Sequence, residues 1–252
     1  MPLLSIITVC RNEEKHIART IESVAGQTFR DYELIVVDGK SGDRTAEIIK
    51  GFGGLVTRFI SEPDGGIYDA MNKGIGMAGG EYLLFLNGGD YLYDPRVLGQ
   101  VFAEPPRADI LYGDMMFEAG GRRTLWSLAQ VRADRDYILG TSLPHPASFI
   151  RRRLFLEHGP YDRSYKFAAD HAFFMRELVR HRATAGYRPV TVAVADAGGI
   201  SCDPKNRRAV EREQARARSE CLSRGQALKW LLLHGPAYQT YQRIKKALSR
   251  HG

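Results

Sequence analysis

The sequence has few cysteines and no long apolar run, and both features narrow the classes of protein to which it can belong. Its three cysteines, Cys10, Cys202 and Cys221, are an odd number without CxxC spacing, which argues against a disulfide framework or a thiolate zinc site. The longest apolar run near the C-terminus covers 230–233, far short of the roughly 20 residues that a membrane-spanning helix needs. The first residues lack a basic segment and a cleavage site. We therefore expect a protein of the reducing cytoplasm.

Positive charge is concentrated at the C-terminal end. The chain of 252 residues has a net charge of +7, and residues 205–252 alone carry +9, from 12 Lys/Arg and 3 Glu. Residues 1–204 carry −2, from 24 Lys/Arg and 26 Asp/Glu. The tail, rather than the nearly neutral body, is thus expected to meet an anionic surface such as a phospholipid leaflet or a polyphosphate-bearing acceptor. No nucleic-acid partner is expected.

Short apolar runs alternate with helical patterns over the first 90 residues. Strands are predicted at 3–9, 33–37, 56–60 and 81–86, with helical periodicity between them. This alternation favours an α/β fold with a mostly parallel sheet that is covered by helices on both faces. In such sheets, ligands bind outside the carboxyl ends of the strands. The polar residues that end these strands are therefore the first candidates for chemistry.

Polar side chains follow the first two predicted strands. Thr8, Asn12 and Glu13 accompany the end of the first strand, and Asp38 ends the second. Asp38 can accept a hydrogen bond from the imide N–H of a pyrimidine base, and Glu13 or Thr8 can hold base or ribose hydroxyls. Each also has an ordinary explanation, because Asp38-Gly39 can be a turn and Glu13 can complement a helix dipole. For any one of them alone, the ordinary explanation is preferred.

Asn87-Gly88-Gly89-Asp90 follows the fourth predicted strand and is a candidate metal element. Two glycines let the backbone approach a ligand closely, and Asp90 offers a hard oxygen to Mg²⁺ or Mn²⁺. An ion there would bridge a diphosphate and neutralise the charge on a nucleoside diphosphate as it leaves a sugar's anomeric carbon. The alternative is a tight turn capped by the aspartate.

Several blocks of the sequence resemble the inverting family-2 glycosyltransferases with a GT-A fold, especially the bacterial exopolysaccharide and colanic-acid-type branch. The resemblance covers roughly residues 3–200. It rests on SIITVCRNEEKHIARTIESVAGQTFRDYELIVVDGKSGDRT, on SEPDGGIYDAMNKGIGMAGGEYLLFLNGGD, and on the later HPASFIRR and FAADHAFFMR segments. The first two blocks together are highly specific.

The resemblance assigns roles to individual residues. It implies that Asp90 is the metal ligand, although the family's usual aspartate-any-aspartate element reads Gly88-Gly89-Asp90 here. Only the last acid is present, so metal binding would be weaker or the ion would lean more on the diphosphate itself. The residues implied to bind the nucleotide-sugar are Thr8, Cys10, Asn12, Glu13, Asp38, Asp64, Asn72, Lys73, Gly88 and Gly89.

The second half of the sequence is expected to form the acceptor side. On sequence alone Asp170 is a helix N-cap, whereas the resemblance implies that it is the catalytic base. A base is required because the acceptor hydroxyl must lose its proton as it attacks opposite the leaving diphosphate, which inverts the anomeric carbon. His145 and Ser201 are further acceptor-side candidates. The segment 198–201 resembles one that closes over the donor.

Two parts of the chain are predicted. Residues 1–204 form a GT-A catalytic domain, with a nucleotide-binding half of about 1–95 and an acceptor half of about 96–204. Residues 205–252 form a basic, amphipathic helical tail. Aromatic and basic side chains mingle over 227–248, which suits an element lying at a membrane interface. Packing on the catalytic body or on a second subunit is an equally weighted alternative.

The sequence thus predicts an inverting, metal-dependent glycosyltransferase that uses a nucleotide-sugar, with UDP as the expected nucleotide. The expected acceptor is a saccharide or a polyprenyl-diphosphate-linked saccharide of exopolysaccharide or O-antigen synthesis, at the inner face of the cytoplasmic membrane. The missing first acid keeps open an inactive nucleotide- or carbohydrate-binding module. A nucleotidyltransferase would need a glycine-rich, basic phosphate loop where the sequence reads Cys10-Arg11-Asn12-Glu13.

Overall fold

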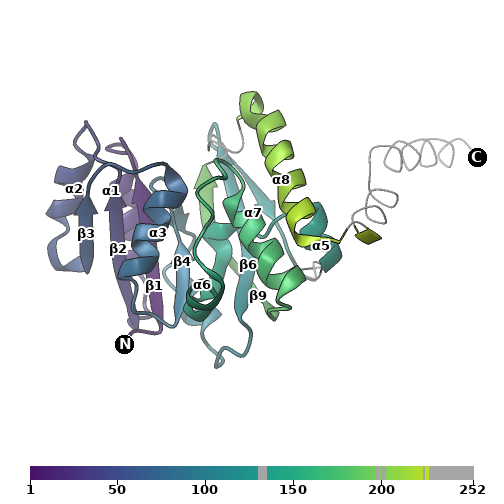
Figure 1. The fold of residues 1–252 in the computed structure, drawn as a ribbon. Coiled ribbons are helices and arrows are strands. Elements are labelled where there is room, and N and C mark those ends of the chain that lie inside the picture. The colour runs from purple at the N-terminus through teal and green to yellow at the C-terminus, as the bar shows by residue number, and fades with distance from the viewer. Residues whose placement is uncertain (130–134, 197–198, 200–202, 224, 227–252) are drawn as a thin grey trace, which may run out of the picture.

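A nine-stranded sheet with helices on both faces organises the protein (Figure 1). The computed structural model describes residues 1–129, 135–196, 199, 203–223 and 225–226. Along the sheet the strand order is β3-β2-β1-β4-β8-β6-β9-β5, and β7 pairs with β6 outside this path. The chain order and the spatial order differ, so long crossover connections bring distant segments to the same edge.

The first half of the sheet is parallel, as the alternation of strands and helices predicts. β1 (Leu4–Cys10) lies between β2 (Tyr32–Asp38) and β4 (Tyr82–Phe85), and β3 (Arg58–Ser61) flanks β2. Every residue of β1 is buried, which a parallel strand covered on both faces requires. The carboxyl ends of these strands therefore meet at one edge.

The second half of the sheet is mixed, and the antiparallel pairs lie there. β8 (Ser148–Arg151) is antiparallel to β4 and to β6 (Ile110–Ala119), while β9 (Ala185–Asp196) runs parallel to β6. The short strand β5 (Tyr91–Leu92) is antiparallel to β9, and β7 (Arg122–Trp126) is antiparallel to β6. The predicted α/β architecture is confirmed, with its fully parallel part confined to the first four strands.

Alternation of side chains along the strands creates two cores, because successive side chains point to opposite faces. Ile6 and Leu34 face one core, and Ile7 and Ile35 face the other. The first core is covered by α1 (Ile17–Ala25), α2 (Thr45–Gly51) and α4 (Val97–Val101). The second is covered by α3 (Ile67–Met77), α5 (Arg135–Gly140), α6 (Arg152–His158), α7 (Ala169–Phe174) and its π-helical continuation η3 (Met175–Arg180). Short 3-10 helices are η1 (Gly53–Leu55), η2 (His145–Ala147) and η4 (Pro204–Asn206).

Helix α8 (Arg207–Cys221), which falls within the predicted tail of residues 205–252, packs on the body. Ala217 is buried in the second core, and the Tyr165 hydroxyl donates to Glu220 at 2.7 Å. The Arg216 guanidinium lies over the Tyr165 ring, 4.2 Å from its centroid. The predicted interfacial segment 227–248 lies outside the described residues. Among those that are described, none of the helices has the length and apolarity to span a bilayer.

Candidate active site

Asp170 is held at the sheet edge by three hydrogen bonds. The Tyr68 hydroxyl (3.1 Å) and the His171 backbone N–H (2.8 Å) donate to its Oδ1, and His145 Nδ1 lies 3.3 Å from its Oδ2. Burial alone would raise the pKa of Asp170, but the hydrogen bond and charge of His145 and the His171 N–H lower it. Because the N-cap of α7 is Ala168, the N-cap explanation for Asp170 is wrong. Asp170 is an ionised carboxylate facing the site.

His145 connects Asp170 to the end of β4. Its Nε2 lies 3.0 Å from Nδ2 of Asn87, while its Nδ1 faces Asp170. Burial opposes the charged imidazole, yet the hydrogen bond to Asp170 and the charges of Asp170 and Asp90 raise the pKa of His145 above its ordinary value. Oδ1 of Asn87 is buried and has no hydrogen-bond partner among the described residues. A ligand hydroxyl or N–H at this edge would satisfy it.

The two glycines before Asp90 allow a close approach of loops. A Cβ on Gly88 would lie 2.8 Å from Cβ of Cys10 and 3.1 Å from Cγ of Glu13, so a larger residue there would displace the end of β1. Gly89 has a φ of +100°, a backbone conformation that favours glycine. The close approach at Gly88 is to the end of β1 and the residues after it, whereas the sequence led us to expect an approach to a ligand.

Thr20 of α1 stabilises this turn through two hydrogen bonds. Its buried hydroxyl accepts the Gly89 N–H at 3.0 Å and donates to the Asp90 carbonyl at 2.7 Å. Both backbone groups of the turn are thereby satisfied by one side chain. The sequence reasoning missed Thr20, because a threonine inside a helical pattern carries no signal of a contact 70 residues away.

The Asp90 carboxylate fits a divalent ion. Burial raises its pKa to about 6, against the opposing effects of His145 and of the backbone N–H groups of Asp196 and Asn87. No three His, Cys, Asp or Glu side chains are grouped as a metal cage within the described part of the chain. Mg²⁺ and similar ions are commonly held by one or two carboxylates, with phosphate oxygens and water as the other ligands. Asp90 suits that arrangement.

The loops after β1 and β2 are tied to each other. The Asp38 carboxylate accepts the Ser41 N–H and hydroxyl and the Ser61 hydroxyl, the last at 2.5 Å. Asn12 donates its N–H to the Ser41 hydroxyl and accepts the Gly42 N–H at its side chain, both at 2.8 Å. Asp38 therefore stabilises the turn after β2, as its ordinary explanation predicts. Recognition of a base by Asp38 would have to replace one of its serine contacts.

Thr8 and Cys10 lie under the site. Thr8 is fully buried, and its hydroxyl has no hydrogen-bond partner among the described residues. The Cys10 thiol lies 3.8 Å from the Val37 carbonyl, and burial together with Asp38 raises its pKa, so the thiol stays neutral. Glu13 is partly exposed, with Oε2 3.1 Å from His16 Nδ1. Of these three, Glu13 is the one whose polar group reaches the surface.

The predicted donor residues on α3 are engaged in local structure. Asn72 binds the backbone of Tyr161 at two points, through Nδ2 at 2.8 Å and Oδ1 at 3.0 Å. Lys73 donates to the Pro63 carbonyl at 2.7 Å and pairs with Glu62 at 2.8 Å. These contacts hold the loop before α3 and join it to the second half of the chain. These contacts explain the positions of both side chains without any bound nucleotide-sugar.

Asp64 and Ser201 complete the predicted set. Asp64 accepts the Gly66 N–H at 2.9 Å, and its Oδ2 would lie 2.3 Å from a Cβ on Gly39. Asp64 thus lies beside the turn after β2. Ser201 lies outside the described residues, as does most of the predicted closing segment 198–201.

Glu213 of α8 positions the loop that leads to the candidate base, and sequence reasoning missed it. Its carboxylate accepts the backbone N–H groups of Lys166, Phe167 and Ala168 at 2.8, 2.8 and 2.9 Å. These residues immediately precede α7 and Asp170. An acid among many arginines was the only signal in the sequence, and it resembled an ordinary surface charge.

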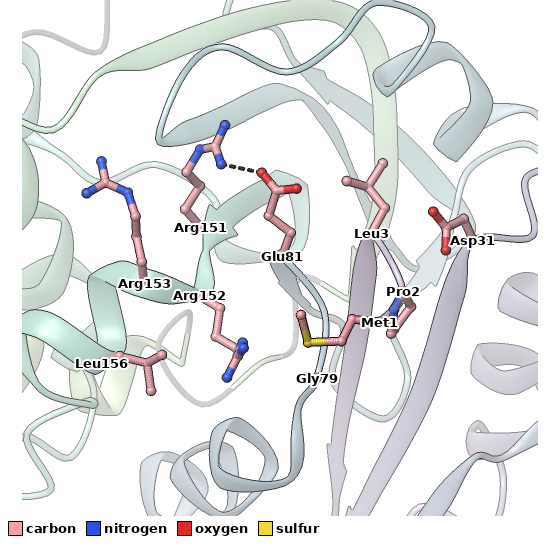
Figure 2. A pocket seen from close by; sticks show the side chains of 10 residues that line it. All are labelled: Met1, Pro2, Leu3, Asp31, Gly79, Glu81, Arg151, Arg152, Arg153 and Leu156. Carbon is pink, nitrogen blue, oxygen red and sulfur yellow. Dashed lines mark hydrogen bonds and ion pairs between the residues drawn. The ribbon is translucent and has the colours of Figure 1, made fainter.

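A cavity of about 410 Å³ lies at the opposite edge of the sheet, beside the amino ends of β1 and β4 (Figure 2). Its arginines are partly neutralised, because Arg151 pairs with Glu81 and Arg153 pairs with Asp109 at 2.6 Å. The lining residues are Met1, Pro2, Leu3, Asp31, Gly79, Glu81, Arg151, Arg152, Arg153 and Leu156. None is a predicted site residue, so this cavity is separate from the candidate active site.

Comparison with known proteins assigns the chain to a family. The sequence profile described as glycosyl transferase family 2 matches residues 5–179. The chain belongs to glycosyl transferase family 2. A PGL/p-HBAD biosynthesis glycosyltransferase of Mycobacterium bovis is 36% identical to this family-2 enzyme over 208 residues, which cover 79% of each chain.

Solved structures show that this family-2 chain has the GT-A fold. Staphylococcus aureus TarS 1-349 in complex with UDP-GlcNAc has a TM-score of 0.72 and 23% identity, and the match covers 90% of this chain and 70% of that one. The mannosyltransferase PcManGT of Pyrobaculum calidifontis, in complex with GDP-Man and Mn²⁺, has a TM-score of 0.69 and 17% identity, and the match covers 100% and 76% of the two chains. The predicted family and fold are confirmed.

Replacing Thr20 should loosen the Asp90 turn. In Thr20→Val the buried Gly89 N–H and Asp90 carbonyl lose their partner, so we expect the free energy of unfolding to fall by about 1–3 kcal/mol. Urea unfolding measures this, and Thr20→Ser, which keeps the hydroxyl, is the matched control. Equal stability of the valine and serine variants would contradict this role of Thr20.

The His145–Asp170 pair should make stability depend on pH. The lowered pKa of Asp170 gives stability that is lost as pH falls through that pKa, and the raised pKa of His145 gives stability that is lost as pH rises through it. The pair thus stabilises most between about pH 4 and pH 6.5. We expect His145→Gln to destabilise more at pH 5.5 than at pH 9 in urea unfolding. A pH-independent loss in His145→Gln would argue against the pair.

Proposed function

We propose that this family-2 enzyme moves a sugar from a UDP-sugar to an acceptor hydroxyl with inversion at the anomeric carbon. The row formed by Asp90, His145 and Asp170 carries the proposal. A desolvated carboxylate stands at one end, where a diphosphate and its ion would lie, and an ionised carboxylate stands at the other. Inverting transfer needs these two functions on opposite sides of the reacting carbon.

Asp170 is the proposed general base. The acceptor hydroxyl gives its proton to the carboxylate while its oxygen attacks the anomeric carbon, and the bond to the diphosphate breaks with its electron pair leaving on phosphate oxygen. A single displacement of this kind inverts the carbon. A carboxylate held by three donors is already oriented, so little reorganisation is needed when the acceptor arrives.

Asp90 is the proposed protein ligand of Mg²⁺ or Mn²⁺. The ion would offset the charge that develops on the departing diphosphate. Burial disfavours the charged form of Asp90 and raises its pKa to about 6, so a nearby cation would stabilise the ionised carboxylate. Thr20 and the glycines at 88 and 89 orient it. The Mn²⁺ and GDP-Man bound by PcManGT support metal use in a protein of the same fold.

UDP is the proposed nucleotide, supported by the UDP and UDP-GlcNAc bound to TarS. The nucleotide would lie over the loops that carry Asn12, Glu13, Asp38 and Asp64. The Asp38 carboxylate would then accept a hydrogen bond from the base in place of one from Ser41 or Ser61. The proposed acceptor is a saccharide or polyprenyl-diphosphate-linked saccharide of exopolysaccharide or O-antigen synthesis. The +9 charge of residues 205–252 supports contact with anionic lipid at the inner face of the cytoplasmic membrane.

A thermal-shift screen tests the donor and metal. We expect UDP-sugars with Mn²⁺ to stabilise the protein by about 2.7 kcal/mol at one hundred times Kd, or about 5–10 °C for a domain of this size. The Mn²⁺-dependent part of this shift should disappear in Asp90→Asn and persist in Asp31→Asn, which alters an acid at the opposite edge. A shift with GDP-sugars alone would replace UDP, and a full shift in Asp90→Asn would remove Asp90 as the ligand.

Asp170→Asn tests the base. The amide cannot accept the acceptor proton, so we expect donor turnover to fall by about 10²–10⁴-fold, with the nucleotide-dependent thermal shift unchanged. Hydrolysis of UDP-sugar measured by UDP release provides the assay. Donor binding without any turnover in the wild-type protein, across donors and acceptors, would favour the inactive binding module instead.

A further inference from the structure

Tyr68 joins the donor side of the site to the candidate base. It is the second residue of α3, immediately after the loop of residues 62–66, and its hydroxyl donates to Oδ1 of Asp170 at 3.1 Å across a separation of 102 residues. We propose that Tyr68 is a positioning residue that occupies Oδ1 of Asp170 and leaves Oδ2 as the oxygen that takes the acceptor proton. This inference rests on the proposed role of Asp170 as base.

The count of lone pairs supports the choice of oxygen. Oδ1 receives two donors, the Tyr68 hydroxyl and the His171 backbone N–H, which fills its two in-plane acceptor sites. Among the described residues, Oδ2 has one hydrogen-bond partner, His145 Nδ1 at 3.3 Å. One acceptor site of Oδ2 is therefore open. The acceptor proton moves to Oδ2, the new carbon–oxygen bond forms, and the bond to the diphosphate breaks.

The Tyr68 phenol is suited to donate throughout the pH range of activity. Tyr68 is buried, and burial together with the charge of Asp170 raises its pKa well above the ordinary value. It therefore stays protonated. The titratable groups that face Asp170 are Tyr68 from α3, Tyr161, His145 from η2 and His171 from α7 itself.

The ring of Tyr68 is fixed by packing. Its centroid lies 5.6 Å from that of Tyr161, which in turn packs against Phe85 at 5.3 Å and Phe173 at 5.4 Å. The Tyr161 hydroxyl, in contrast, is buried without a hydrogen-bond partner among the described residues. The two tyrosines are neighbours in one aromatic cluster, and of the two hydroxyls only that of Tyr68 is hydrogen-bonded to Asp170. Tyr161 thus provides a matched control.

The loop before α3 ties the base to the donor side. Lys73 binds Glu62 and the Pro63 carbonyl, and Asp69 accepts the Gly65 N–H at 2.9 Å. Gly66 has a φ of +122°, so the chain turns sharply into the helix that carries Tyr68. A shift of this loop would move the Tyr68 hydroxyl relative to Asp170. The orientation of the base is thereby set from the donor half of the chain.

Carbon-13 NMR of aspartate carboxyl carbons tests the interaction without any substrate. The resonance absent from Asp170→Asn identifies Asp170, and its titration gives its pKa in the full-length wild-type protein, in Tyr68→Phe and in Tyr161→Phe. We expect a pKa below the ordinary aspartate value in the wild type, an increase in Tyr68→Phe and no change in Tyr161→Phe. An ordinary value in the wild type, or equal values in all three proteins, overturns the proposal, and the wild-type titration decides even if Tyr68→Phe does not fold.

Kinetics distinguish the inference from the proposed function. With the best UDP-sugar of the thermal-shift screen, we expect Tyr68→Phe to lower kcat about fivefold, as for one lost hydrogen bond, with the donor KM unchanged and the acidic limb of the pH profile moved to higher pH. Tyr161→Phe should match the wild type. An unchanged profile in Tyr68→Phe overturns the inference. A shifted Asp170 titration in a protein without turnover supports the Tyr68 contact and contradicts the proposed transferase activity.

Discussion

The contact between His145 and Asp170 is the interaction on which the site depends. It joins η2, before β8, to the start of α7, and it reaches β4 through Asn87. The hydrogen bond between the two side chains offsets part of the desolvation that each would otherwise suffer. Without a partner, a buried carboxylate would take up a proton and lose its capacity as a base.

Burial acts to raise the pKa of both carboxylates of the site, but their hydrogen-bond partners leave them with different net shifts. Asp170 has donors on both oxygens and keeps a lowered pKa, whereas the pKa of Asp90 rises to about 6. Similar residue types at one edge thus differ in pKa, which suits the roles proposed for Asp170 as the base and Asp90 as the metal ligand. The difference comes from the surroundings rather than from the residues themselves.

Support for these side chains comes from far along the chain. Glu213 of α8 holds the three backbone N–H groups before α7, and Thr20 of α1 holds the turn before Asp90. Both act through backbone atoms of these loops. Such contacts restrict the loops that carry the candidate site residues. Losing them would shift the positions of those residues without changing the side chains themselves.

The sequence by itself determined the α/β alternation, the strand-end location of Asp38 and Asp90, and the resemblance to the family. Local patterns suffice for these features, because side-chain periodicity and turn chemistry act between near neighbours. Only the tertiary structure decided that Thr8 is buried, that Asn72 clamps the Tyr161 backbone, and that α8 belongs to the body. It also decided the partners of Asp170, because hydrogen bonds across 25 and 102 residues leave no trace in sequence spacing.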